Sequence, residues 1–256
     1  KMALRQIDRK EEHKEARRVA RAGSAQKSGG RQTSSAEAGA SAAKRPKANH
    51  PSSSELESAP TLRAEVAPEV EFFLVHKNTD PDYELMPPKG RSGRREVARM
   101  SFSIDAVAEF EDFVEDMYDF ADAQALSVDT LIHENGAAQL EINFNHGDPL
   151  DMADQVFVFK RTVRETAQRH NMYATFMAKP MQKEPGSALH IHQSILSLET
   201  GRNIFNDVND QPTPELMHYI AGLQRYTPDL ISFYAPNVNS YRRLAPDISA
   251  PINLSW

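Results

Sequence analysis

Two glutamates near the start of the aromatic-rich part of the chain are spaced for joint ligation. Glu69 and Glu71 lie at positions i and i+2 of the segment Glu69–Val75, whose Val and Phe content predicts a strand. Alternate residues of a strand face the same side, so both carboxylates point the same way. Alone, such a pair is also typical of an ordinary polar strand face. The run Phe72-Phe73-Leu74-Val75 indicates that the strand enters the core, where two carboxylates are costly unless a cation joins them. A divalent metal ion would meet that cost.

A histidine pair repeats this geometry. His190 and His192 are again two residues apart in a segment predicted to be a strand. By itself the pair is as compatible with a structural or surface role as with metal binding. If it acts together with the glutamates, hard carboxylates and a single histidine favour Mg²⁺ or Mn²⁺ over a zinc site.

Two more glutamates flank a turn. Glu134 and Glu141 belong to the predicted strands 128–134 and 139–144, which surround the turn-favouring dipeptide Asn135-Gly136. A two-residue hairpin would pair position 134 with position 137 and would place Glu141 about 13 Å further along the same face, too far to share one ion. Joint ligation therefore requires residues 135–138 to form a wider loop, and spacing alone favours the tight turn.

The remaining elements predict an α+β fold in which antiparallel strands alternate irregularly with helices. Ser103 can cap a helix whose apolar residues recur at helical spacing from Ile104 to Ala121. Further helices are expected over Asp151–His170 and Pro214–Tyr226, further strands over Tyr173–Ala178 and Leu189–Leu198, and loops over Asp80–Arg99, Lys179–Ser187 and Ala235–Pro251. Neither of the two common glycine-rich phosphate-binding loops occurs in the sequence.

The composition divides the 256 residues into two unlike parts. Residues 1–66 carry 14 Lys and Arg against 8 Asp and Glu and no aromatic residue, whereas residues 67–256 carry 16 against 28 and all 20 aromatic residues. We therefore predict a basic, disordered tail over 1–66 and one domain over 67–256. The net charge of −6 gives a nucleic-acid role no support, and the absence of cysteine excludes disulfides and thiolate chemistry and fits a cytoplasmic protein. Because the chain begins at Lys1 rather than Met and stops at Trp256, we expect it to be a fragment or a processed gene product.

The order of the motifs is more specific than any one of them. The chain resembles the glutamine synthetase catalytic domain from about residue 67 to its end, and it is most similar to the branch that joins glutamate to organic amines, the γ-glutamylpolyamine synthetase-like proteins. The motifs that carry the resemblance are, in order, Glu69-x-Glu71-Phe72-Phe73, His133-Glu134 with Gln139-x-Glu141, Ala174-Thr175-Phe176-Met177-Ala178-Lys179-Pro180, Gly186-Ser187-Ala188-x-His190-x-His192-x-Ser194, and Asn239-Ser240-Tyr241-Arg242-Arg243-Leu244 with Ala250-Pro251.

The resemblance implies an ATP-dependent ligase with two metal ions. It implies a curved antiparallel sheet flanked by helices, and a γ-carboxylate activated as an acyl phosphate before an amine attacks. One Mg²⁺ or Mn²⁺ would be held by Glu71, Glu134 and Glu141, and the second by Glu69 and His190.

The same resemblance assigns the substrate positions. His192 and Ser194 match positions at the nucleotide, Gly186 matches the backbone that meets glutamate, and Arg243 matches the catalytic arginine that binds its carboxylate. For Lys179, at a strand end before a proline, a nucleotide-binding role and a purely structural role stay open.

One departure from the family pattern bears on the amine. Ser249 stands where ammonia-using members place a glutamate that binds ammonium and takes its proton, which suggests a roomier site for an amine with its own carbon chain. The family's small N-terminal domain is not recognisable in residues 1–66, and its last metal glutamate lies beyond Trp256.

Three hypotheses follow. The first is a carbon–nitrogen ligase that forms γ-glutamyl amides from glutamate, ATP and ammonia or an organic amine, in a ring-type homo-oligomer when complete. The second is a catalytically inactive fragment or paralogue that keeps the fold for binding or assembly. The third, a nucleic-acid binder acting through the basic tail, predicts an affinity that falls steeply with salt.

Overall fold

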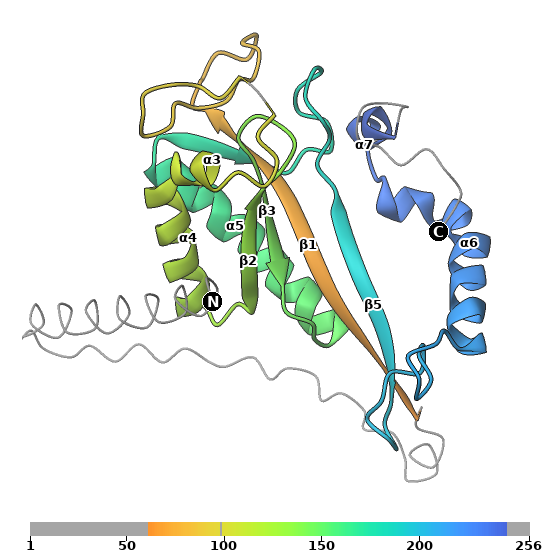
Figure 1. Cartoon of the computed structure of the whole chain (residues 1–256). Coiled ribbons are helices and arrows are strands. Elements are labelled where there is room, and N and C mark those ends of the chain that lie inside the picture. Colours follow the sequence, from red (N-terminus) through yellow and green to blue (C-terminus); the bar gives the residue numbers. More distant parts are fainter. Residues whose placement is uncertain (1–60, 98, 245–256) are drawn as a thin grey trace, which may run out of the picture. The chain divides into compact units, whose positions relative to one another are not determined.

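The structure, a computed structural model, describes residues 61–97 and 99–244. Residues 1–60 of the expected tail, together with Ser249 and Ala250-Pro251, lie outside the described residues. The described part contains a five-stranded antiparallel sheet and five helices (Figure 1). No helix in these two ranges combines the length and the apolar character needed to cross a bilayer.

The central strand, β1 (Leu62–His76), organises the sheet. One of its edges pairs with β3 (Gln139–Phe144), which in turn pairs with β2 (Val128–His133). The other edge is shared by two strands. β5 (Leu189–Ser197) pairs with the first nine residues of β1, and β4 (Met172–Thr175) pairs with its last four. All five expected strand regions are therefore confirmed, although β4 ends at Thr175 rather than at residue 178.

β1 starts earlier than expected. The strand begins at Leu62, inside the range 1–66 that was predicted to be disordered. Its first residues pair with Ser194 to Ser197 of β5, more than 120 positions away in the sequence. The local composition carries no trace of this partner, and the sheet therefore extends five residues into the expected tail.

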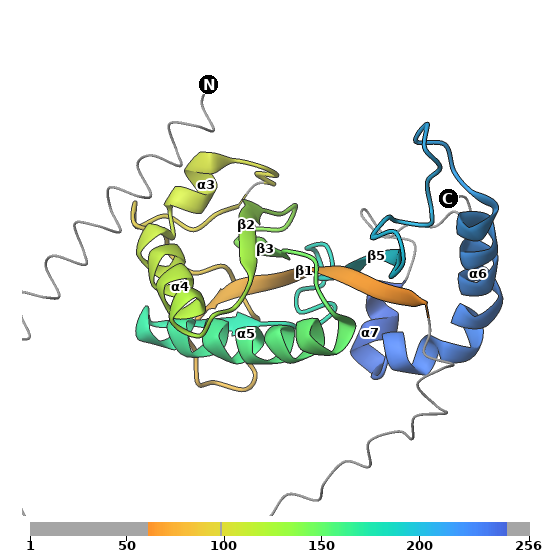
Figure 2. The same ribbon diagram turned by 90° about the horizontal axis from the view of Figure 1, so that it is seen from below.

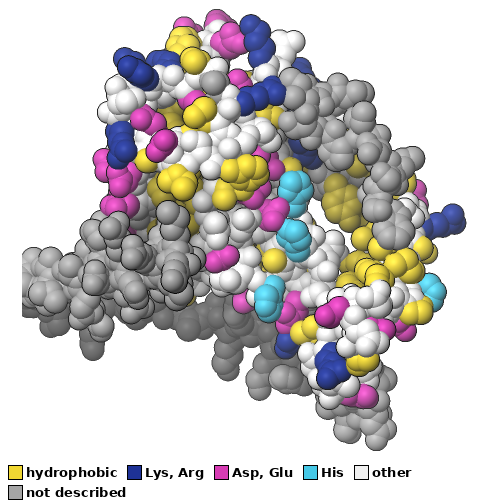
Figure 3. Space-filling view, viewed as in Figure 1, with side chains coloured by type: hydrophobic (Ala, Val, Ile, Leu, Met, Phe, Trp, Pro, Cys, Tyr) yellow, Lys and Arg dark blue, Asp and Glu magenta, His cyan; other side chains and the backbone are white. Residues whose placement is uncertain are grey.

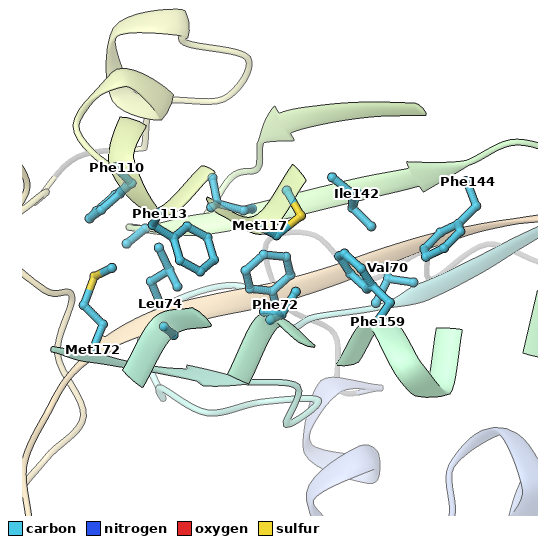
Figure 4. Close-up of a cluster of buried hydrophobic side chains, with 14 of the residues drawn as sticks. Val70, Phe72, Leu74, Phe110, Phe113, Met117, Ile142, Phe144, Phe159 and Met172 are labelled. Carbon is cyan, nitrogen blue, oxygen red and sulfur yellow. The ribbon is translucent and has the colours of Figure 1, made fainter. Parts of the chain in front are cut away.

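Helices cover one face of the sheet. α4 (Glu111–Ala123) and α5 (Pro149–Arg169) lie along it (Figure 2), and their apolar residues close the main core. Phe72 of β1 is fully buried between Phe113 of α4, at a ring-centroid distance of 6.4 Å, and Phe176 at 5.4 Å. Phe144 and Phe159 meet edge to face at 5.2 Å (Figure 4). The core thus fixes the even-numbered residues of β1 and leaves its odd-numbered residues to the opposite face.

The expected helix from residue 104 is two helices. Ser103 caps α3 (Ile104–Ala108), as predicted, by accepting the Ala106 N–H, but α3 ends before α4 begins at Glu111. The Glu109 carbonyl accepts the Arg91 N–H from the preceding loop, which interrupts the helical hydrogen-bond pattern at this point. Ile104, expected on the apolar stripe, is 83% exposed.

The C-terminal helices also differ from expectation. α6 (Pro214–Tyr234) continues through Pro228 instead of ending at Tyr226, and it buries no residue. The segment 235–251, expected to be a loop, contains α7 (Val238–Arg243), which is capped by the Asn237 side chain through the Ser240 N–H. This cap is a local signal that the proline and asparagine content obscured.

Candidate active site

A row of polar residues, here called the ladder, runs along the sheet face opposite α4 and α5. Its members on β1, β3 and β5 are Glu69, Glu71, Glu141, His190, His192 and Ser194. The register places Glu71 opposite Glu141 of β3, and Glu69 opposite His190 of β5. Acidic and histidine side chains gather over these strands (Figure 3). The sheet register therefore brings together side chains from three separate motifs on one face.

Glu71 is held in place by the neighbouring chain segments. Its Oε2 accepts hydrogen bonds from Gln139 Nε2 and from the Ala188 N–H, both at 3.0 Å. The side chain is 9% exposed. Burial raises the pKa of Glu71, because desolvation outweighs the Ala188 hydrogen bond and the nearby charges of His190 and Arg243. Gln139, which faces the same side as Glu141, is a site residue that the sequence reasoning quoted but gave no role.

Glu141 lies in the most crowded position. It is 5% exposed, and burial together with the negative charges of Glu69, Glu134 and Glu71 raises its pKa to about 7. A carboxylate with three like-charged neighbours and little water is stable in its charged form only when a cation joins the group.

Glu69 links the acidic cluster to both histidines. Its carboxylate lies 3.1 Å from His190 Nδ1 and 2.7 Å from His192 Nε2. Burial opposes ionisation of Glu69, but the hydrogen bonds and charges of His192 and His190 outweigh it and lower the pKa of Glu69. One ligand atom each of Glu69, Glu141 and His190 lies within 4.8 Å of the others.

The donor set fits a hard divalent cation. It consists of carboxylate oxygens and one imidazole, which suit Mg²⁺ or Mn²⁺. The family resemblance assigned Glu141 to one ion and Glu69 with His190 to another, whereas the structure groups Glu141 with the latter two. Since Glu141 also faces Glu71, the expected ligands form one contiguous cluster.

Glu134 reaches this cluster because its loop is wide. The Glu134 N–H donates to the Gln139 carbonyl at 2.8 Å, and His133 pairs with Leu140, so residues 135–138 form a four-residue loop. The tight two-residue turn is therefore wrong, and the wider loop that joint ligation requires is present. The Gln139 side chain accepts the Gly136 N–H at 2.8 Å, a contact that the Asn135-Gly136 dipeptide does not reveal. The charge of Glu134 helps to raise the pKa of both Glu71 and Glu141.

Arg243 and Gly186 meet at one end of the ladder. Arg243 Nη1 donates to the Ser187 carbonyl at 2.7 Å. A Cβ at Gly186 would lie 2.5 Å from Arg243 Cγ and 2.7 Å from the Ala178 carbonyl oxygen, so only glycine permits this approach. The Gly186 carbonyl also accepts from Gln139 Nε2 at 3.0 Å, which joins this end to Glu71.

α7 is attached to the loop that holds Gly186. The Asn239 side chain accepts the Lys179 N–H at 2.8 Å and donates to the Lys179 carbonyl at 2.9 Å. Lys179 Nζ donates to the Glu184 carbonyl at 2.7 Å, so the structure gives this lysine a contact within its own loop. Asn239 is a second residue to which sequence reasoning gave no role, since its partner lies 60 positions away.

The other end of the ladder is open. His192 lies opposite Ala67 and Ser194 opposite Glu65, which places both on the face of His190. The His192 side chain is 64% exposed and accessible to a ligand. From Ser194 to Gly186, the expected nucleotide residues His192 and Ser194, the carboxylate cluster, and the expected glutamate residues Gly186 and Arg243 follow one another in that order. Lys179, the third expected nucleotide residue, lies instead in the loop that holds Gly186.

Comparisons with known proteins identify the family of this chain. Residues 52–256 match the family described as the glutamine synthetase catalytic domain. The chain is 36% identical over 194 residues to the gamma-glutamylputrescine synthetase PuuA of Escherichia coli, covering 75% of this chain and 41% of that protein. It is 33% identical over 195 residues to a glutamine synthetase of Pyrococcus abyssi, covering 76% and 42%.

A solved structure shares the fold. GmaS in complex with ADP superposes with a TM-score of 0.61 at 25% identity, over 78% of this chain and 44% of that one. The chain thus spans about two fifths of the length of the curated relatives it matches. On this evidence, the chain belongs to the glutamine synthetase catalytic-domain family.

Proposed function

We propose that this chain forms part of an ATP-dependent ligase that joins the γ-carboxylate of glutamate to an amine through a γ-glutamyl phosphate. The observation that carries the proposal is the order of residues along the ladder. Ser194 and His192 lie at one end, Gly186 and Arg243 lie at the other, and the carboxylate cluster lies between them. Transfer of a phosphoryl group between two anions needs this order, with positive charge held between donor and acceptor.

Each end has the chemistry of its substrate. Arg243 would bind the α-carboxylate of glutamate, because a guanidinium offers paired donors to a carboxylate. Gly186, which has no side chain, lets the Arg243 side chain pack directly against the backbone of this loop. His192 and Ser194 would contact the nucleotide at the other end, whereas Lys179 lies in the loop that holds Gly186. The similarity to GmaS, whose structure was solved with ADP, supports a nucleotide as substrate.

Glu69, Glu71, Glu134, Glu141 and His190 would hold Mg²⁺ or Mn²⁺. When bound, the metal would neutralise phosphate charge that otherwise repels the incoming carboxylate. The protein's own part is to keep these carboxylates converged, through Gln139 and the Ala188 N–H on Glu71 and through the wide loop that carries Glu134.

The acceptor is proposed to be an organic amine rather than ammonia alone. The similarity to a gamma-glutamylputrescine synthetase and the small, neutral Ser249 support this assignment. We further propose that the complete protein is a cytoplasmic homo-oligomer of the ring type.

Phosphate release from ATP tests the function. The protein should release phosphate only when Mn²⁺, glutamate and an amine are all present, and putrescine should support a higher rate than ammonia at equal concentration. Phosphate release that is independent of glutamate would refute the ligase assignment. Binding of ADP and Mn²⁺ without phosphate release under any condition would identify a binding role instead.

A further inference from the structure

The loop that presents Glu134 is held by side chains from distant parts of the chain. Its four N–H groups are all accepted by side-chain oxygens. Asn135 N donates to Glu134 Oε2 at 3.0 Å, and Gly136 N donates to Gln139 Oε1 at 2.8 Å. The other two bonds come from outside the hairpin, because Ala137 N donates to Glu184 at 3.1 Å and Ala138 N donates to Glu96 Oε2 at 2.8 Å.

Glu96 makes a second contact to the same hairpin. Its Oε2 also lies 3.0 Å from Nε2 of His133, a side chain that is fully buried. His133 Nδ1 lies 2.7 Å from the Glu134 carbonyl oxygen, which can only accept, so Nδ1 carries a proton. The contact with Glu96 is then made either by an imidazolium donating to a carboxylate or by a carboxyl group donating to a neutral imidazole.

The segment around Glu96 bonds to the hairpin at further points. The Phe102 N–H donates to the His133 carbonyl at 2.8 Å, and Ser101 Oγ donates to Asn135 Oδ1 at 2.5 Å. Glu96 is the member of this set that bonds directly to the last residue of the loop, where Ala138 takes the left-handed φ of 57°. A non-glycine residue in that conformation costs energy, so the contacts around it must compensate.

The buried carboxylate of Glu96 destabilises the folded state more than a purely structural residue at this position would. Its Oε1 is buried and has no hydrogen-bond partner among the described residues. Leaving a polar oxygen buried and unpaired destabilises the folded state, a cost that an apolar side chain of similar size would avoid. The other carboxylate oxygen, Oε2, lies within hydrogen-bond distance of both Ala138 N and His133 Nε2.

We infer that Glu96 is a positioning residue for the metal cluster, acting through Glu134. By holding Ala138 and His133 it keeps the hairpin loop wide, and the wide loop brings Glu134 beside Glu71 and Glu141. The inference rests on the proposed metal-binding role of Glu134.

Mn²⁺ binding to the 256-residue chain, measured by calorimetry with the metal alone, tests this inference. Glu96→Ala should weaken Mn²⁺ binding by about 10- to 100-fold, the usual effect of removing a group that orients a metal ligand. Glu96→Gln should recover most of the affinity, because the amide oxygen still accepts the Ala138 N–H. In a Glu134→Gln background, Glu96→Ala should cause little further loss, since the residue through which it acts is already disabled.

Glu109→Ala is the matched control. Glu109 also accepts a backbone N–H with its carboxylate, that of Ser92 at 3.1 Å. Among the described residues, its carboxylate makes no hydrogen bond to residues 135–138. This variant should leave Mn²⁺ affinity unchanged. If Glu96→Ala does not fold, Glu96→Leu fills the same space without an acceptor and enters the same comparison.

Three results would overturn the inference: wild-type affinity in Glu96→Ala, an equal loss in Glu109→Ala, or a loss that is undiminished in the Glu134→Gln background. A wild-type chain that binds no Mn²⁺ would refute the metal site of the proposed function. In that case hydrogen exchange still tests the positioning role, because Glu96→Ala should accelerate exchange of the Ala138 amide. Unchanged exchange would refute it.

Discussion

Replacing Glu141 by glutamine should have opposite effects on the metal-free and the metal-bound domain. In the folded chain the pKa of this carboxyl is about 7, against 4.5 for the unperturbed group. The folded state therefore holds the proton more tightly than the unfolded state, and stability is lost as pH rises from about 4.5 through about 7.

The size of the effect follows from that difference. At about 1.4 kcal/mol for each pKa unit, the full cost above pH 7 is about 3 kcal/mol. Glu69, which supplies part of the repulsion, is itself 25% exposed, so solvent screening reduces the expected value to about 2 kcal/mol. Glu141→Gln removes this charge without changing the side-chain volume. At pH 8 without metal, the variant should be about 2 kcal/mol more stable than wild type, whereas at pH 5 the two should be nearly equal.

Mn²⁺ should make wild type more stable than Glu141→Gln at pH 8. At a concentration of 100 times its Kd, an ion that binds only the folded state stabilises it by about 2.7 kcal/mol. Wild type should gain this stabilisation and Glu141→Gln should lose most of it. Urea unfolding measures the free energy of unfolding of each protein at pH 5 and pH 8, with and without Mn²⁺. Glu199→Gln, at an exposed position, serves as the control for the loss of one negative charge. Equal stabilities at pH 8 without metal, or full Mn²⁺ stabilisation of the variant, would refute the reasoning.

Three further substitutions test other parts of the site. His190→Ala should weaken Mn²⁺ binding by about 2 kcal/mol, the worth of one interaction with a charged group, and an unchanged calorimetric titration would exclude it as a ligand. Asn239→Ala removes two hydrogen bonds that attach α7, so it should cost about 2 kcal/mol of unfolding free energy and should raise the KM for glutamate more than it lowers kcat. An unaltered KM would show that Arg243 is positioned by other contacts. Ser249→Glu, in the active protein, should raise the ratio of glutamine to γ-glutamyl alkylamide in a competition assay, because general-base catalysis is worth about 10² to 10⁴ in rate; a ratio equal to that of wild type would place the amine preference elsewhere.

The strand-borne part of the site could be predicted from the sequence. Glu69, Glu71, His190 and His192 were each placed on a common strand face by the period of two, and the register confirms both pairs on one side of the sheet. The alternation is local information, since it depends only on whether the segment is a strand. The apolar run from Phe72 identified that strand correctly.

The loop-borne part could not be predicted in the same way. The Asn135-Gly136 dipeptide favours a tight turn, but the observed loop is fixed by Glu96, Gln139 and Glu184, two of which lie about 40 positions or more away. Contacts at that separation leave no periodic pattern. The same holds for the start of β1 at Leu62, which depends on β5, and for α7, whose attachment depends on Asn239 and Lys179.

Tracing a γ-carboxylate oxygen of glutamate tests most directly whether the protein activates glutamate as an acyl phosphate. If glutamate is activated as an acyl phosphate, attack of the amine breaks the bond between the acyl carbon and the bridging oxygen, and that oxygen leaves with the phosphate. Glutamate labelled with ¹⁸O in its γ-carboxylate, incubated with the protein, ATP, Mn²⁺ and putrescine, should therefore yield inorganic phosphate that carries one ¹⁸O atom for each amide formed. Phosphate that carries ¹⁸O only when the water is labelled would show that ATP is hydrolysed without activation of glutamate, and would contradict the proposed ligase.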